Sequence, residues 1–296
     1  MRRGARLRRG FAALAIASAF CLGAATSSVA KPPMWIVTSP QAKLVLFGSI
    51  HLLPPGLDWR PPALDDALAT ADEFWTELPI NAASDNEANA TTIARGGLPP
   101  GRSLSALLTA DEAVRLRKAA LDLNCAPAAL DRMQPWMAEF VLSIADDARG
   151  GADAFNGVEE QLQAITPLSV RRMAFETARQ QIEFLAGAPV KDQVASLNWT
   201  LSEIEDDPRS YQRVVDEWMA GDLAGLQRDA VQPLQTVSPG LYRRLLTQRN
   251  HAWAKVLAAR LHRKGTAVVV VGVGHMIGPD GLPALLRAQG FDVQGP

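Results

Sequence analysis

The stretch Lys43-Leu-Val-Leu-Phe-Gly-Ser-Ile-His51 has the pattern of a buried β-strand that ends on a glycine and presents a histidine three residues later. A second stretch, Thr266-Ala-Val-Val-Val-Val-Gly-Val-Gly-His275, repeats this design near the other end of the sequence. Continuous apolar runs rich in β-branched residues are typical of central parallel strands covered on both faces. Open α/β sheets bind ligands just beyond the carboxyl ends of such strands. We therefore expect the two histidines to lie at one site.

The residues around these two runs predict an α/β fold. The expected elements are a hairpin over 35–50 turned at Ser39-Pro40, a helix over 63–71, a strand over 73–78, a helix over 281–289 and an edge strand over 291–294. The order strand, helix, strand is the unit from which parallel sheets are built. We predict a small, mostly parallel sheet formed by both ends of the chain, with a large helical insertion over about residues 103–262.

Two segments carry more local expectations. Residues 81–101 are polar and small and contain Gly96-Gly97 and Pro99-Pro100, which predicts a surface loop. One apolar stripe at helical spacing predicts a single helix that ends at Gly187, and its members are Val170, Met173, Ala174, Ala178, Ile182 and Leu185.

The first thirty residues have the pattern of a secretory signal. Five arginines without an acidic residue precede an apolar stretch over residues 11–25, and Ser28-Val-Ala30 fits a signal peptidase site. We predict cleavage after Ala30, export to the periplasm, and a single domain over residues 31–296. The alternative is an uncleaved anchor, although the apolar stretch is shorter than the roughly 20 residues that a spanning helix needs.

The composition of the predicted mature chain excludes some classes of protein. Without the five arginines of the signal, 25 basic and 31 acidic residues remain, a net charge of about −6. A nucleic-acid-binding protein needs a basic face, so this class is disfavoured. No further membrane span is expected after cleavage. Cys125 is then the single thiol, which excludes an internal disulfide, and its surroundings do not resemble a catalytic cysteine. The sequence does not set the oligomeric state.

The histidines and one glutamate are the strongest candidates for chemistry. His51 and His275 each follow a strand in a Gly-x-x-His motif, where Gly48 and Gly272 permit close approach of a ligand or backbone. Glu77 ends the strand over 73–78 and points to the same edge of the sheet. Two histidines and a carboxylate with one open position are the ligands of many catalytic zinc sites. The alternative is that these side chains only hold loops and strand ends.

The remaining polar residues give weaker signals. His251 and His262 lie in an arginine-rich helical segment, which favours a surface position. Glu159 and Glu160 stand at a predicted helix start, where the helix dipole stabilises acidic residues without any further role. Glu176, Gln181 and the pair Arg249-Asn250 are also polar residues in helical segments, and the residue pattern alone leaves each of them open between surface and site.

The whole predicted mature chain resembles the TraB/GumN family, part of a wider group that includes the Tiki proteases, the erythromycin esterases and the haem-binding ChaN proteins. The matching residues occur in family order and are Trp35, Leu46-Phe-Gly-Ser-Ile-His-Leu52, Trp75-Thr-Glu-Leu78, Leu98-Pro-Pro-Gly101, Pro135-Trp136, Gly157-Val-Glu159, Leu162, Phe175-Glu-Thr177, Gln181, Trp218, Gly221-Asp222, Arg249-Asn250, Val271-Gly-Val-Gly-His-Met276, Gly281 and Leu286-Arg-Ala-Gln-Gly290. The resemblance implies His51, Glu77 and His275 as the active site. It implies Arg249, Glu159, Glu176 and Asn250 as residues around that site.

The leading hypothesis is an exported, metal-dependent hydrolase, in one form a peptidase, that acts on a peptide or small-molecule substrate. His51 and His275 would bind Zn, Mn or Co, with Glu77 as the third ligand or as general base. Arg249 would hold a substrate carboxylate or stabilise an oxyanion. A metal-free variant would use a histidine as base, oriented by a glutamate.

Two alternatives belong to different classes of protein. A ChaN-like protein would bind haem or iron through the histidines as axial ligands. An accessory protein of envelope or exopolysaccharide assembly would carry a degenerate site, because members of one family differ widely in chemistry.

Overall fold

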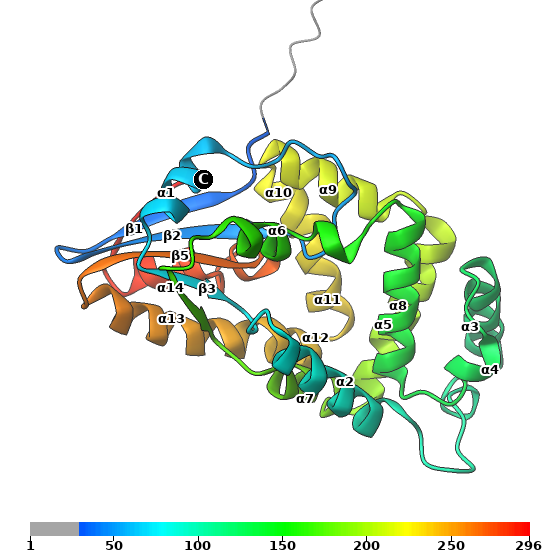
Figure 1. The fold of residues 1–296 in the computed structure, drawn as a ribbon. Coiled ribbons are helices and arrows are strands. Elements are labelled where there is room, and N and C mark those ends of the chain that lie inside the picture. Colours follow the sequence, from blue (N-terminus) through cyan, green and yellow to red (C-terminus); the bar gives the residue numbers. More distant parts are fainter. Residues whose placement is uncertain (1–29) are drawn as a thin grey trace, which may run out of the picture.

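A six-stranded sheet carries both glycine–histidine motifs (Figure 1). The computed structural model describes residues 30–296, so the predicted signal lies, apart from Ala30, outside the described residues. The strand order is β4-β3-β5-β2-β1-β6. The strands are β1 (Met34–Thr38), β2 (Ala42–Ser49), β3 (Glu73–Thr76), β4 (Arg171–Ala174), β5 (Gly265–Gly272) and β6 (Asp292–Gln294).

The central strands are parallel, as the sequence predicts. β4, β3, β5 and β2 run in one direction, and β1 and β6 add antiparallel neighbours at one side. β2 and β5 pair along their full length, with Ser49 opposite Gly272. Both motifs therefore end at the same edge of the sheet. The predicted mostly parallel sheet, formed by both ends of the chain, is confirmed.

Helices cover both faces of this sheet, which explains the unbroken apolar runs. α1 (Pro62–Thr70) and α6 (Val158–Ile165) lie over one face, and α13 (Gln248–Leu261) and α14 (Leu282–Ala288) lie over the other (Figure 1). The side chains of residues 267–271 in β5 have no exposed surface. A strand buried on both faces has no position where a polar side chain would reach water, so every residue is apolar.

The middle of the chain is mostly helical, and buried residues between 104 and 204 form a second hydrophobic cluster separate from the one around the sheet. Its α-helices are α2 (Ala82–Gly96), α3 (Ala110–Asp122), α4 (Pro127–Leu130), α5 (Pro135–Arg149), α7 (Ala178–Ala186), α8 (Val190–Asp206), α9 (Ser210–Ala220), α10 (Leu223–Leu226), α11 (Gln232–Val237) and α12 (Pro239–Tyr242). Short 3₁₀ or π turns occur at η1 (Ser105–Leu107), η2 (Ala154–Asn156), η3 (Gln227–Val231), η4 (Arg243–Thr247) and η5 (Val273–His275). Within residues 30–296, no helix has both the length and the apolar character needed to span a membrane.

The expected surface loop over residues 81–101 is wrong, because most of it is helix α2. The Asn81 side-chain oxygen accepts hydrogen bonds from the backbone N–H groups of Ala83 and Ser84, which caps the helix. The alanines that follow have high helix propensity, and this outweighs the polar composition.

The expected single helix over residues 170–185 is also wrong. Residues 171–174 form strand β4, which pairs in parallel with β3, and α7 begins only after Thr177. Thr177 and Gln180 form a capping box at that helix start. The helical insertion thus contains one strand of the sheet, because pairing with β3 outweighs the local helical pattern.

A buried carboxylate anchors the amino end of β3. Glu73 has no exposed surface and accepts hydrogen bonds from Trp75 Nε1 at 2.8 Å and from Arg260 Nε at 2.7 Å. Arg260 is itself only 2% exposed, while Arg171 and Arg263 contact the same carboxylate from the surface. Burial alone would raise the pKa of Glu73, but these donors hold it below its ordinary value.

The change Glu73→Gln should lower the free energy of unfolding by about 3–5 kcal/mol, because it leaves the Arg260 guanidinium buried without a counter-charge. Urea unfolding measures this change. Asp122→Asn is the matched control, since it removes the exposed Lys118–Asp122 pair and should cost about 1 kcal/mol or less. Equal losses in the two variants would contradict the anchoring role of Glu73.

Candidate active site

His51 stands just beyond the end of β2 and is the accessible residue of the site. Its side chain is 59% exposed, and Nδ1 lies 2.9 Å from Oε1 of Glu159. Glu159 sits in the first turn of α6 and also accepts a hydrogen bond from the Ser49 hydroxyl. The negative charge of Glu159 is the main cause that raises the pKa of His51 to about 9. His51 is therefore an imidazolium at neutral pH.

His275 lies in η5 directly after β5 and is buried, with 4% exposure. Its Nδ1 is 2.5 Å from Oδ1 of Asn250, whose Nδ2 donates to the backbone oxygen atoms of His275 and Asp280. The Asn250 oxygen is thus the acceptor, and His275 carries its proton on Nδ1. Burial lowers the pKa of His275 to about 3, so the ring is neutral. The ring of Trp253 packs against it, with 4.5 Å between the ring centroids.

Glu77 lies between the two histidines and is held from several directions. Its Oε1 accepts the backbone N–H of Gly272 at 2.9 Å. Its Oε2 accepts Nη2 of Arg249 at 2.6 Å and Nε2 of Gln181 at 3.0 Å. Burial alone would raise the pKa of Glu77, but the neighbouring histidines and Arg249 hold it well below its ordinary value. The carboxylate is therefore ionised.

Arg249 is a buried cation that connects two carboxylates. Its side chain is 5% exposed, and its guanidinium group contacts Glu77 and Glu176. Nη1 donates to the backbone oxygen of Leu245 and lies 3.1 Å from Nε2 of His275. The guanidinium also lies 4.6 Å from the centre of the Trp253 ring, a cation–π contact. These contacts fix Arg249 beneath Glu77 and leave few of its N–H groups for a ligand.

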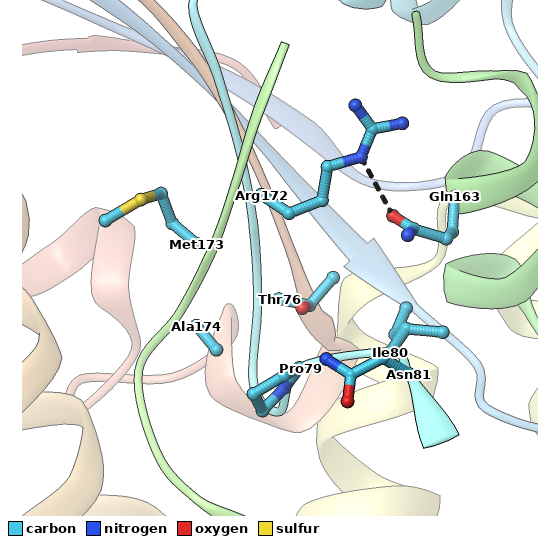
Figure 2. A pocket seen from close by; sticks show the side chains of 8 residues that line it. All are labelled: Thr76, Pro79, Ile80, Asn81, Gln163, Arg172, Met173 and Ala174. Carbon is cyan, nitrogen blue, oxygen red and sulfur yellow. Dashed lines mark hydrogen bonds between the residues drawn. The ribbon is translucent and has the colours of Figure 1, made fainter. Parts of the chain in front are cut away.

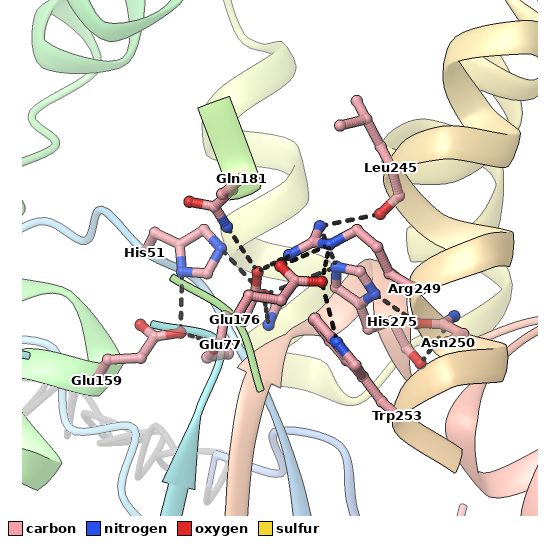
Figure 3. A network of polar contacts seen from close by, with 12 residues as sticks. His51, Glu77, Glu159, Glu176, Gln181, Leu245, Arg249, Asn250, Trp253 and His275 are labelled. Atoms are coloured by element: carbon pink, nitrogen blue, oxygen red, sulfur yellow. Dashed lines mark hydrogen bonds and ion pairs between the residues drawn. The ribbon is translucent and has the colours of Figure 1, made fainter. Parts of the chain in front are cut away.

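The two histidines converge on one carboxylate oxygen (Figure 3). Nε2 of His51 and Nε2 of His275 each lie 3.7 Å from Oε1 of Glu77. Gly272 makes this approach possible. A Cβ atom there would lie 3.1 Å from His51 Nε2 and 3.3 Å from Glu77 Oε1. The absence of a side chain at position 272 therefore keeps open the space beside these two groups.

The structure brings together all the residues that the sequence nominates. His51, Glu77, His275 and Arg249 form the centre, with Glu159, Glu176 and Asn250 in direct contact with them. Gly48 lies within β2, below the polar groups of the site. Its carbonyl oxygen accepts a hydrogen bond from Trp218 Nε1, and a Cβ atom there would lie 3.0 Å from Val273. His251 and His262 are exposed on α13 and at its end, away from this network.

Three residues make contacts that the residue pattern did not anticipate. They are Ser49, whose hydroxyl donates to Glu159, Gln181, whose amide donates to Glu77, and Trp253, which donates to Glu176 and packs on His275. Ser49 and Gln181 do stand within the segments that resemble the TraB/GumN family. Trp253 follows Arg249 by one helical turn, and this spacing is the available signal for it.

A divalent metal ion fits the chemistry of these donors. Each histidine has its Nδ1 held by a side-chain oxygen, which is the arrangement usual for metal-binding histidines. Each therefore directs Nε2 to the Glu77 carboxylate. Two nitrogens and one carboxylate oxygen are a ligand set suited to zinc and related ions.

Binding of a metal would require small adjustments. Donor atoms around one tetrahedral zinc ion are about 3.3 Å apart, somewhat closer than the 3.7 Å contacts seen here. Accordingly, no group of three or more His, Cys, Asp or Glu side chains in residues 30–296 already has the spacing of a metal site. His51 would have to lose its Nε2 proton, and Arg249 would have to release Nε2 of His275.

The change Glu159→Gln should lower the pKa of His51 toward its ordinary value near 6.5, because the nearby negative charge is removed. Titration of the imidazole C–H signals by NMR on metal-free protein measures this. The raised pKa stabilises the fold below about pH 6.5, and this stabilisation is lost as pH rises through about 9. The variant should lack that decline. Glu160→Gln, next along α6, is the control, and an unchanged His51 titration in Glu159→Gln would refute the assignment.

Comparison with known proteins identifies the family of this chain. The search of curated proteins finds no match, and neither does the search of solved structures. The model of the TraB/PrgY/gumN family matches residues 33–295, which includes every strand and every residue of the site. The chain therefore belongs to the TraB/PrgY/gumN family.

Proposed function

We propose that the chain is a hydrolase whose active site is formed by His51, Glu77 and His275, with a divalent metal ion held by these three residues. The observation that carries this proposal is the common 3.7 Å approach of both Nε2 atoms to Oε1 of Glu77. A side-chain oxygen also fixes each Nδ1, which is the arrangement expected of metal-binding histidines beside a carboxylate ligand.

The protein residues would divide the work of binding and proton transfer. When bound, the metal would lower the pKa of a water molecule and polarise a substrate carbonyl. His51 is on the open side of the site, so the substrate would approach from there. Glu159 would hold the His51 ring, and Asn250 would hold the ring of His275. Glu77 would serve as the third ligand or accept a proton.

Arg249 is better suited to positioning than to substrate binding. Its contacts to Glu77 and Glu176 are at 2.6 Å and 2.9 Å, and its side chain is nearly buried. Two carboxylates around one guanidinium fix the orientation of Glu77 and compensate its charge. The expectation that Arg249 binds an oxyanion or a substrate carboxylate remains a prediction, and it would require Arg249 to leave one of these partners.

The substrate would be a peptide or another small molecule with a hydrolysable carbonyl. The predicted signal supports export to the periplasm, where such a hydrolase would meet envelope peptides and esters. The negative charge of the predicted mature chain argues against nucleic acid as the substrate.

A metal-free hydrolase is the second candidate, and the Glu159–His51 pair favours it. A histidine oriented by a carboxylate is the arrangement of a general base. In the free protein, the pKa of about 9 would keep His51 protonated at neutral pH. A metal-free enzyme that uses His51 as base would therefore become active only as pH rises toward 9.

Haem binding and a non-catalytic role in the envelope are the candidate functions outside the hydrolases. His275 is packed between Trp253 and Arg249, which leaves His51 as the accessible axial ligand for haem. A Soret band that appears on haem addition and is lost in His51→Ala would favour the haem-binding class.

Purified protein loaded with zinc, manganese or cobalt should retain about one metal ion per chain, measured by mass spectrometry after desalting. His51→Ala/His275→Ala should lose it, because one carboxylate alone binds such ions weakly. His251→Ala/His262→Ala is the matched control, since both of its histidines are exposed and lie outside the site. Stoichiometric metal in both double variants, or in neither variant nor the wild type, would exclude this metal site.

Activity measured on a mixed panel of peptides and esters distinguishes the metal-dependent hydrolase from the metal-free one. Activity lost on chelation and restored by metal supports the metal-dependent enzyme. Activity that survives chelation and rises toward pH 9 supports the metal-free one.

A further inference from the structure

A pocket of about 270 Å³ lies at the carboxyl ends of β3 and β4, beside the site (Figure 2). Pro79, Ile80 and Ala174 supply apolar surface, and Asn81 and Gln163 supply two carboxamides. Its volume is sufficient for one large amino-acid side chain. It lies outside the network of His51, Glu77 and His275, and nothing in the proposed chemistry uses it.

Two short connections join this pocket to the active site. Thr76 is the last residue of β3 and lines the pocket, and Glu77 follows it directly in the chain. Gln163 lines the pocket one turn of α6 after Glu159, the residue that holds His51. Residues four apart on a helix have Cβ atoms about 6 Å apart on one face. The pocket is thus bordered by the same strand end and the same helix that carry Glu77 and Glu159, and a substrate side chain near the scissile bond is the group that would reach it.

The two carboxamides present donors to the pocket. Oδ1 of Asn81 accepts the backbone N–H groups of Ala83 and Ser84, and Oε1 of Gln163 accepts Nε of Arg172. These contacts orient each amide, so its NH₂ group is the part left for a ligand. Among residues 30–296, no acceptor forms a hydrogen bond with either NH₂ group in the pocket. In Figure 2, Gln163 lies at the upper right and Asn81 lies below it, next to Ile80.

The charges around the pocket favour a neutral ligand. The Arg172 guanidinium group donates to the backbone oxygens of Thr166, Pro167 and Val170, so its N–H groups are already used. Its positive charge still disfavours a cationic side chain. Asp85 lies one turn after Asn81 on α2. Glu160 lies three residues before Gln163, and partial burial and the nearby charge of Asp85 raise its pKa. These two acids do not line the pocket, but they stand on the helices that carry Asn81 and Gln163, where their negative charge would disfavour an anionic side chain.

We propose that this pocket binds one uncharged side chain of a peptide substrate, with an apolar stem and an oxygen acceptor at its end, as in glutamine. The stem would contact Pro79 and Ile80, and the terminal oxygen would accept from Asn81 and Gln163. The part of this proposal that concerns substrate choice rests on the proposed hydrolase function, whereas the binding does not.

Binding is measured first, with N-acetyl glutamine amide, leucine amide and lysine amide as probes. The side-chain amide signals of Asn81 and Gln163, followed by NMR on the whole protein, should shift with the glutamine probe. Its affinity should exceed that of the other two by roughly tenfold, because only the glutamine probe can accept hydrogen bonds from both carboxamides. The same result is expected in His51→Ala/His275→Ala, which tests the pocket without catalysis. Equal affinities, or no shift at millimolar probe, would overturn the proposal.

The variant Asn81→Asp/Gln163→Glu replaces the two hydrogen-bond donors of the pocket with carboxylate acceptors. Both new carboxylates keep the oxygen that caps α2 or accepts from Arg172, so the fold is preserved, but both donors are lost. The variant should bind the lysine probe better than the glutamine probe. Asn89→Asp, an exposed position on the same helix, is the control and should keep the wild-type order. An unchanged order in the double variant would count against the pocket.

Hydrolysis of a peptide library then separates the two proposals. Cleavage that favours glutamine beside the scissile bond and loses this preference in Asn81→Asp/Gln163→Glu supports both. Cleavage without such a preference overturns the role of the pocket in substrate choice but leaves the hydrolase. Glutamine-probe binding without cleavage of any peptide or ester leaves the pocket and overturns the hydrolase.

Discussion

The ionised carboxylate of Glu77 is the group on which the whole site depends. It is buried, and a buried anion is stable only when several donors replace the water it has lost. Gly272 on β5, Arg249 on α13 and Gln181 on α7 supply those donors. These donors come from three distant parts of the chain. The charge of Glu77 therefore fixes the positions of β5, α13 and α7 relative to the end of β3. In the proposed function, the same charge would help to hold a metal ion between the two histidines.

The two histidines share one hydrogen-bonding design but differ in environment. Each has its Nδ1 held by a side-chain oxygen, yet the pKa is about 9 for His51 and about 3 for His275. The carboxylate of Glu159 stabilises the charged form of one ring, whereas burial, with Arg249 nearby, disfavours the charged form of the other. Pairs of titratable groups whose environments separate their pKa values are common where acid and base roles are divided. The open ring is thus suited to exchange protons with solvent, and the buried ring to remain a neutral ligand.

The sequence predicts the strand-borne part of the site better than its surroundings. His51, Glu77 and His275 could be placed together because parallel strands end at one edge of a sheet, and this rule needs no knowledge of helix packing. The contacts made by residues on helices were harder to predict. The contact of Gln181 with Glu77, for example, depends on where α7 begins. That helix was predicted to start too early, since the apolar spacing over residues 170–174 fits a helix as well as a buried strand. Only pairing with β3 decides between them, and such pairing is a property of the whole fold.

The position of β5 between β2 and β3 has a consequence for how the protein is made. β2 and β3 are separated by a short segment, but their common neighbour begins only at Gly265. The central strand is thus synthesised nearly last, and contacts between such distant residues form slowly. Until β5 arrives, Glu77 lacks Gly272 and the site lacks His275. The chain therefore cannot assemble this charged centre until its synthesis is almost complete, and any form truncated before β5 lacks both His275 and the Gly272 N–H group.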